Sequence, residues 1–181
     1  MMELVAQSIA NKSLGDRIIK VNHAGEHGAV SIYTGQIVMA RITAPGMVPE
    51  LVEFRTHERS HRALFKAELS RRGRPRCRSY WLCACGGLAL GLITGLLGKD
   101  AIAATTTAVE SVVLRHLRHQ LDALGDEDPE AVAAISAIME EEQLHHDQSA
   151  SHSNVNGFWS RLLTPIVSAS TETVIWLGMR L

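Results

Sequence analysis

The chain has 181 residues, a formal net charge of −1, 46% hydrophobic residues and only 4% aromatic residues. A chain of this length can bury a substantial core, so we expect a single domain over residues 1–181. The near-zero charge excludes nucleic-acid binding driven by bulk charge, and many apolar residues with few aromatics favour an all-α fold over sheets.

The first predicted unit is a helical hairpin over residues 13–73, broken at residues 43–49 by two prolines and a glycine. Glu26 lies before the break, and Glu58 after it opens a Glu-x-x-His sequence that ends at His61. Residues three apart lie on one helix face, so Glu58 and His61 should point the same way. Glu26 is farther from the break than Glu58, so we expect the connection to run partly along the bundle and bring the two carboxylates level.

A basic segment and an apolar helix follow this hairpin. Residues 71–78 include five arginines, and residues 81–98 contain no charged side chain, which predicts an apolar helix over residues 79–99. Eighteen uncharged residues are long enough to cross a bilayer, although five glycines weaken such a helix in water. We favour an interfacial helix with its arginines at anionic lipid head groups, and a spanning helix and a buried core helix are the alternatives.

The second predicted hairpin, over residues 100–152, repeats the spacing of the first. Glu110 is followed 32 residues later by Glu142, which opens a second Glu-x-x-His sequence ending at His145. The glutamates of the first hairpin are separated by the same 32 residues, and the whole pattern is shifted by 84 positions. Pro129 is expected in the first turn of the returning helix, which places Glu110 and Glu142 at a similar height above the turn.

The last predicted element is an amphipathic C-terminal helix over residues 156–181. Trp159 and Trp176, with Arg161 and Arg180 nearby, are typical of a helix at a membrane interface. A helix packed on the core is an equal alternative.

The repeated pattern predicts six metal ligands carried by four helices. They are Glu26, Glu58, His61, Glu110, Glu142 and His145. Four carboxylates and two imidazoles suit two iron ions per chain, with manganese as the alternative, and indicate a ferritin-like four-helix bundle to which the apolar helices are added. Glu141 with His145, Glu142 with His146, and His57 with His61 are also spaced for chelation, but only the chosen set recurs in both hairpins.

Several motifs resemble those of the demethoxyubiquinone hydroxylase family. They are residues 16–29 (DRIIKVNHAGEHGA), 32–36, 97–99, 108–110, 127–129, 141–147 and 174–181, so the likeness extends from about residue 13 to the end. The six residues found by spacing are also those that the family motif nominates. His27, Asn22 and Leu117 depart from residues common in the family (an aromatic, Asp and Tyr), whereas His116 matches it, so the departures concern contacts around the metals and the quinone.

The resemblance implies an O2-dependent di-iron monooxygenase that inserts one oxygen atom into the ring of a polyprenylated demethoxybenzoquinol. It also implies an external electron donor and contact with membrane lipids. Further copies of the chain or other proteins of ubiquinone biosynthesis are the expected protein partners. The implied location is peripheral, on the cytoplasmic face of a bacterial inner membrane or the matrix side of the inner mitochondrial membrane.

Three other functions compete with this interpretation. A ferritin-like protein that oxidises and stores iron would share the ligands, but the apolar residues 81–98 argue against it. A rubrerythrin-like peroxidase would carry rubredoxin-type cysteine pairs, whereas Cys77, Cys83 and Cys85 have no second cluster beside them and are expected to be reduced thiols. A structural membrane protein is the least specific alternative. We see no secretory or transit signal before residue 13.

Overall fold

The computed structural model describes the backbone of residues 2–154 and 156–181, and side chains from residue 14 onward within these ranges. Helices and their connections make up all of the described chain, with no strand in it, which confirms the predicted all-α fold class. The elements are α1 (Met2–Thr43), the short 3-10 helix η1 (Pro45–Met47), α2 (Val48–Arg71), α3 (Tyr80–Leu96), α4 (Lys99–Leu124), α5 (Pro129–Ser136), α6 (Met139–His152) and α7 (Phe158–Gly178).

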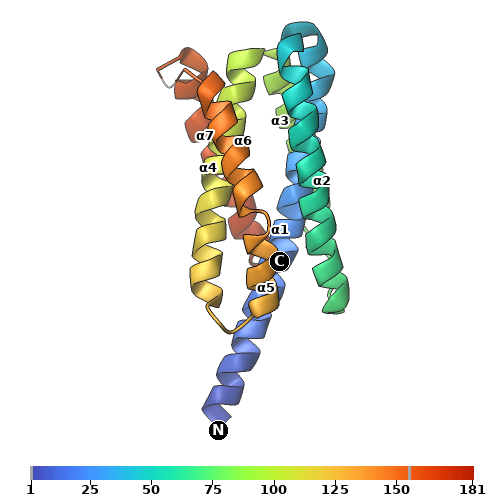
Figure 1. Cartoon of the computed structure of the whole chain (residues 1–181), viewed down its shortest axis with the longest axis vertical. Helices are drawn as coiled ribbons and strands as arrows, with labels where there is room; N and C mark the ends of the chain where they lie inside the picture. The colour runs from blue at the N-terminus through green and yellow to red at the C-terminus, as the bar shows by residue number, and fades with distance from the viewer. Residues whose placement is uncertain (1, 155) are drawn as a thin grey trace.

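The helices form two similar halves (Figure 1). In the first half α2 and α3 both pack on α1, and in the second half α6 and α7 both pack on α4. The four helices that carry the predicted ligands, α1, α2, α4 and α6, therefore make the bundle, and α3 and α7 are additional helices beside α1 and α4. The repeat seen in the sequence thus has a counterpart in the arrangement of the helices.

The connection between α1 and α2 is tight and includes the 3-10 helix η1, which continues directly into α2. A 3-10 helix rises about 2 Å per residue, more than an α-helix does, so η1 adds height to the α2 side of the hairpin. This added height helps to bring Glu58 level with Glu26, which lies farther from the connection.

The returning arm of the second hairpin differs from the expected single helix. Pro129 does lie in the first turn of α5, and the Asp128 carboxylate caps that helix by accepting a 3.1 Å hydrogen bond from the Ala131 amide. The arm is then interrupted between α5 and α6, next to Ile135 and Ile138, which both insert into the core. The prediction of one continuous helix from Pro129 was therefore wrong: the helix is interrupted at Ala137 and Ile138, which spacing alone does not reveal.

The α3 helix lies unusually close to α1. A Cβ atom on Gly87 would overlap the carbonyl oxygen of Gly28, and one on Gly91 would overlap that of Ile32. The glycines of this apolar segment therefore allow two backbones to meet, which explains why so many occur in a helix. The opposite face of α3 is apolar and exposed, at Trp81, Leu82, Leu88, Ile93 and Leu96.

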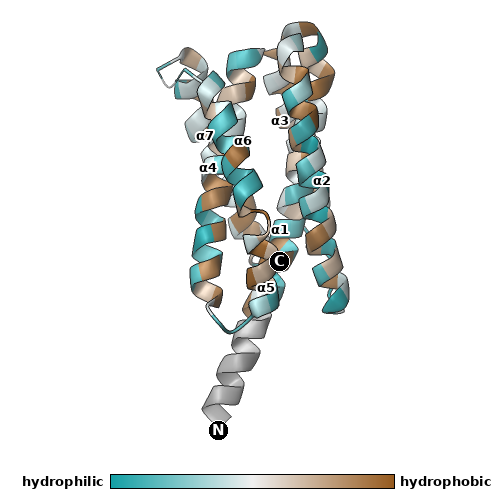
Figure 2. Ribbon diagram, viewed as in Figure 1, coloured by the Kyte–Doolittle hydropathy of each residue, from teal (hydrophilic) through white to brown (hydrophobic). Residues whose placement is uncertain are grey.

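Apolar residues are concentrated in α3 and α7. The α2 and α6 helices are rich in polar residues, drawn in teal in Figure 2. The α7 helix likewise exposes large apolar side chains, at Phe158, Leu162, Ile166 and Trp176. Among the helices of the described residues, none is long and apolar enough to cross a bilayer. The exposed apolar face of α3 does not fit the alternative of a helix buried in the core.

The arginine cluster at the end of α2 is used differently from the expectation. Arg72 forms ion pairs of 2.6 Å with Glu68 and with Asp128, and Arg74 forms one of 2.6 Å with Asp16. These contacts tie α2 to α1 and to the start of α5. Arg72 is mostly buried by these contacts, whereas the Arg74 side chain is 53% exposed, so contact of Arg74 with lipid head groups stays a prediction.

Candidate metal centre

The six predicted ligands lie in the middle of the bundle, between two apolar clusters. One cluster contains Tyr33, Leu51, Phe54 and Ile102, and the other contains Ile19, Phe65, Leu117 and Ile138. Glu26 comes from α1, Glu58 and His61 from α2, Glu110 from α4, and Glu142 and His145 from α6. All six side chains are buried, the most exposed being Glu26 at 6%. Buried carboxylates in such number require partners of positive charge.

The six residues form two overlapping groups, each of three carboxylates and one imidazole. The first group is Glu26, Glu58, His61 and Glu142, and the second is Glu58, Glu110, Glu142 and His145. Within each group the ligand atoms all lie within 4.8 Å of one another. Glu58 and Glu142 belong to both groups and would be shared if each group held a metal ion, whereas Glu26 and Glu110 belong to one group each.

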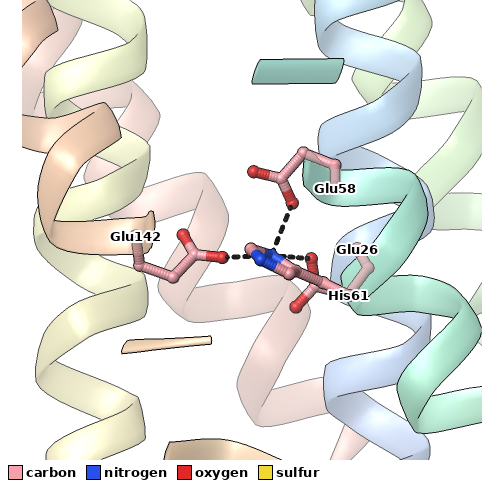
Figure 3. A group of neighbouring side chains, drawn as sticks. All are labelled: Glu26, Glu58, His61 and Glu142. Carbon is pink, nitrogen blue, oxygen red and sulfur yellow. Dashed lines mark ion pairs between the residues drawn. The ribbon is translucent and has the colours of Figure 1, made fainter. Parts of the chain in front are cut away.

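The facing atoms of the site are close together but do not form hydrogen bonds. The Nδ1 atom of His61 lies 2.9 Å from Glu142 Oε1, with carboxylate oxygens of Glu26 and Glu58 each at 3.8 Å (Figure 3). The Nδ1 atom of His145 lies 3.1 Å from Glu58 Oε1. These two nitrogens and their nearest oxygens are buried without a hydrogen-bond partner. Lone pairs that converge in this way fit a metal ion better than they fit one another.

The pKa values of the carboxylates also indicate a site suited to cations. Burial raises the pKa of Glu26 well above its ordinary value, and the charge of Glu58 adds to this. Burial raises the pKa of Glu110 in the same way, with the charge of Glu142 as the next cause. Burial opposes ionisation of Glu58 as well, but the adjacent imidazoles of His145 and His61 outweigh it and lower its pKa. Two divalent ions would balance four ionised carboxylates and remove this conflict.

Three residues outside the six hold ligands in place. The hydroxyl of Tyr33 donates a 2.8 Å hydrogen bond to Glu110 Oε1, and burial, followed by the charge of Glu110, raises the pKa of Tyr33 so that it keeps its proton. Glu141 Oε2 lies 2.7 Å from His61 Nε2, and His57 Nδ1 lies 3.0 Å from His145 Nε2. The spacing argument did not assign these roles. For His57 and Glu141 a signal was present, because their positions also differ by 84; Tyr33 has no such counterpart.

The competing ligand pairs point elsewhere in the structure. Glu141 approaches His61 from outside the two groups, and its side chain is 45% exposed. His146 contacts Ser111 and Asp147 instead of the centre. His57 lies against His145, not beside His61 as a chelating partner. The structure therefore gathers the set that repeats in both hairpins and leaves the alternatives outside it.

A cavity of about 270 Å³ reaches the centre from the side of α3 and α7. Carboxylates of the centre (Glu26, Glu58, Glu110 and Glu142) form part of its wall. Most of the remaining lining is apolar and comes from α1, α3, α4 and α7, with Ile32, Leu90, Val113, Leu117 and Val174 among the lining residues. An apolar molecule in this cavity would therefore touch the ligands of the proposed metals.

Polar groups in the cavity are few and paired. Asn22 and Gln120 exchange two hydrogen bonds of 2.8 and 3.0 Å between their amides, and both line the cavity. His116 lines it as well, and its Nε2 atom lies 2.6 Å from Glu172 Oε2 on α7. His27 instead stacks on Tyr80 with ring centroids 4.0 Å apart, so this departure from the family lies against α3.

Comparison with known proteins gives a consistent result. The family described as ubiquinone biosynthesis protein COQ7 matches residues 13–178. The chain is 35% identical to the NADPH-dependent 3-demethoxyubiquinone 3-hydroxylase of Mus musculus, over 94% of this chain and 79% of the relative. It is 36% identical to the 3-demethoxyubiquinol 3-hydroxylase of Rhodospirillum rubrum, over 93% and 79%. It is 28% identical to the 5-demethoxyubiquinone hydroxylase of Saccharomyces cerevisiae, over 96% and 81%.

Proposed function

The chain belongs to the ubiquinone biosynthesis protein COQ7 family, and on this basis we propose that its buried Glu/His centre holds two iron ions for the hydroxylation of a demethoxyubiquinol ring. The protein is a hydroxylase of ubiquinone biosynthesis, as its relatives are named, and a hydroxylase of this kind is a monooxygenase. The predicted iron-storage, peroxidase and structural alternatives gain nothing from these relatives. The single observation that carries the proposal is the apolar cavity that ends on the carboxylates of the centre.

The donor set fits iron. Glu26 and Glu110 would each hold one ion, Glu58 and Glu142 would be shared between the two ions, and an imidazole nitrogen would complete each group. Oxygen donors with one nitrogen per metal suit iron or manganese, and the oxygen chemistry of a monooxygenase favours iron. The bound iron pair supplies the activation of O2. The chain contributes the buried ligands, the Tyr33 hydroxyl that orients Glu110, and walls that keep bulk water from the ring.

The proposed substrate is a polyprenylated demethoxybenzoquinol that enters the cavity with its ring toward the centre. Apolar side chains such as Val113 and Leu117 would contact the ring faces, and the Asn22–Gln120 pair offers amide groups to its oxygen substituents. The cavity is bordered by α3 and α7, so the prenyl tail would leave between these helices. Their exposed apolar side chains would then face the same lipid as the tail.

The reaction needs two electrons, and the product remains a quinol only if these electrons come from a donor other than the ring. Insertion of one atom of O2 into a ring C–H bond gives a hydroxyl group, and the second atom leaves as water after taking up two electrons and two protons. An external donor must therefore serve the site. Several relatives are named NADPH-dependent, which makes reduced nicotinamide the first donor to test.

The protein is proposed to act at a membrane surface without spanning it. The apolar outer faces of α3 and α7 would enter the lipid, and Arg76 and Arg78, which lie just before α3, would meet anionic head groups. Relatives named as mitochondrial favour the matrix side of the inner mitochondrial membrane, and for a bacterial chain the equivalent surface is the cytoplasmic face of the inner membrane. Further copies of the chain or other proteins of ubiquinone biosynthesis would meet it there.

The proposal is tested by complementation of a strain that lacks its own demethoxyubiquinol hydroxylase. The wild-type chain should clear the accumulated demethoxyubiquinone and restore ubiquinone, measured by quinone profiling. His145→Ala should fail to do so at equal protein level, because one metal loses its only nitrogen donor. His119→Ala, an exposed histidine of α4, is the matched control and should complement. Failure of the wild-type chain in this strain, or complementation by His145→Ala, would contradict the proposal.

A further inference from the structure

The two ligand histidines are held from outside by residues at equivalent positions of the repeat. His61 and His145 differ by 84 positions, and so do His57 and Glu141. Each of the latter contacts the histidine of the other half: Glu141 contacts His61, and His57 contacts His145. The contacts are therefore related by the same pseudo-symmetry as the ligands. The chemistry is not symmetric, because one partner is a carboxylate and the other an imidazole.

The direction of each hydrogen bond follows from the ligand geometry. Both histidines aim Nδ1 at the carboxylates of the centre, so the Nδ1 lone pair is the one available to a metal. A neutral imidazole that coordinates through Nδ1 carries its proton on Nε2. His61 Nε2 therefore donates to the Glu141 carboxylate, and His145 Nε2 donates to Nδ1 of His57. The two rings of the histidine pair are nearly parallel, with 8° between their planes, so the bond lies close to both ring planes.

We propose that His57 positions His145 by accepting its hydrogen bond, and that the metal on the His145 side is the more weakly held of the two because the accepting imidazole of His57 is neutral. This inference rests on the two-metal centre of the proposed function. A carboxylate acceptor draws the imidazole proton and makes the coordinating nitrogen more basic, which strengthens its bond to the metal. An imidazole acceptor fixes the same orientation and tautomer but carries no charge, so it strengthens the metal bond less.

The test uses the full chain, stripped of metal by a chelator and reloaded with Co(II), a spectroscopic substitute for Fe(II). Proton NMR of the loaded protein should show one strongly shifted, exchangeable N–H signal for each coordinating imidazole. Glu141→Ala assigns the His61 signal and His57→Ala assigns the His145 signal. On addition of increasing chelator to the wild type, the His145 signal should disappear first.

The variants separate positioning from a general effect on the fold. His57→Ala should weaken Co(II) binding on the His145 side about 10- to 100-fold, the usual effect of removing such a partner, and leave the His61 signal in place. His57→Gln offers an amide oxygen as acceptor and should restore binding close to that of the wild type. His57→Glu should bring the two metals closer to equal retention, since both imidazoles would then donate to carboxylates. Circular dichroism of each variant checks that the helices are retained.

Several outcomes would overturn the inference. Simultaneous loss of both signals during chelation of the wild type, or earlier loss of the His61 signal, contradicts the unequal retention. Unchanged Co(II) affinity in His57→Ala contradicts the positioning role, as does a loss that His57→Gln does not restore. A wild-type chain that binds two Co(II) ions in these experiments leaves the proposed function intact, whereas one that binds fewer than two contradicts both.

Discussion

Replacing Gly91 by alanine should separate α3 from α1 and destabilise the protein. The added Cβ atom would overlap the carbonyl oxygen and carbonyl carbon of Ile32, and a helix backbone cannot move aside as a flexible side chain can. Overpacking of this kind costs about 3 kcal/mol at its upper end, whereas the better helix propensity of alanine contributes about 1 kcal/mol of stability. The free energy of unfolding should therefore fall by about 2 kcal/mol.

Gly86→Ala is the matched control, because it makes the same chemical change in the same helix. A Cβ atom at Gly86 has no neighbour within 4 Å, so only the gain in helix propensity, about 1 kcal/mol, should remain. Thermal unfolding followed by circular dichroism should then place the melting temperature of Gly91→Ala about 6–12 °C below that of Gly86→Ala. Equal melting temperatures for the two variants would refute the close packing of α3 on α1, and with it the shape of the cavity wall.

Three further predictions concern charge, lipid and assembly. Metal-free protein should lose stability as the pH rises above about 4.5, because the folded state keeps protons on Glu26 and Glu110 that the unfolded chain releases near pH 4.5. Urea unfolding at a series of pH values should show this loss, and metal loading should reduce it. The double variant Arg76→Ser/Arg78→Ser should sediment less with anionic vesicles, because each arginine contributes about 1 kcal/mol of binding free energy. Arg74→Ser should lose less binding, since the Arg74 side chain pairs with Asp16, and equal losses of binding would contradict the assignment. A fragment that ends before α3 and a fragment that starts at α4 each carry three of the six ligands, so they should bind iron only when they are mixed. Tight iron binding by one monomeric fragment would argue against a shared centre.

The sequence was informative about the ligands because metal binding constrains residue type and spacing together. A Glu-x-x-His sequence on a helix points both side chains the same way. Its recurrence, each time with a second glutamate 32 residues earlier, can be recognised in the sequence without knowing how the helices pack. The all-α fold class and the family were confirmed. The assignment of the six residues as iron ligands stays a prediction, now with a geometry that favours it.

Other features could not be predicted because they depend on how the helices rotate and where they bend. The contact between His57 and His145 joins residues on two helices, and whether it forms depends on the rotation of each about its axis. The interruption between α5 and α6 depends on core packing around Ile138. The ion pairs of Arg72 need acidic partners that are distant in sequence, so an arginine cluster read alone was assigned to lipid.

The most direct test of the central claim is the fate of oxygen during the reaction. The iron-loaded protein, supplied with a short-chain demethoxyubiquinol, a chemical reductant and 18O2, should form the hydroxylated quinol with one 18O atom in its new hydroxyl group, detected by mass spectrometry. Glu142→Ala, which removes a carboxylate common to both metal groups, should form none while keeping its helix content. A product whose new oxygen comes from water, or full turnover by Glu142→Ala, would contradict the account.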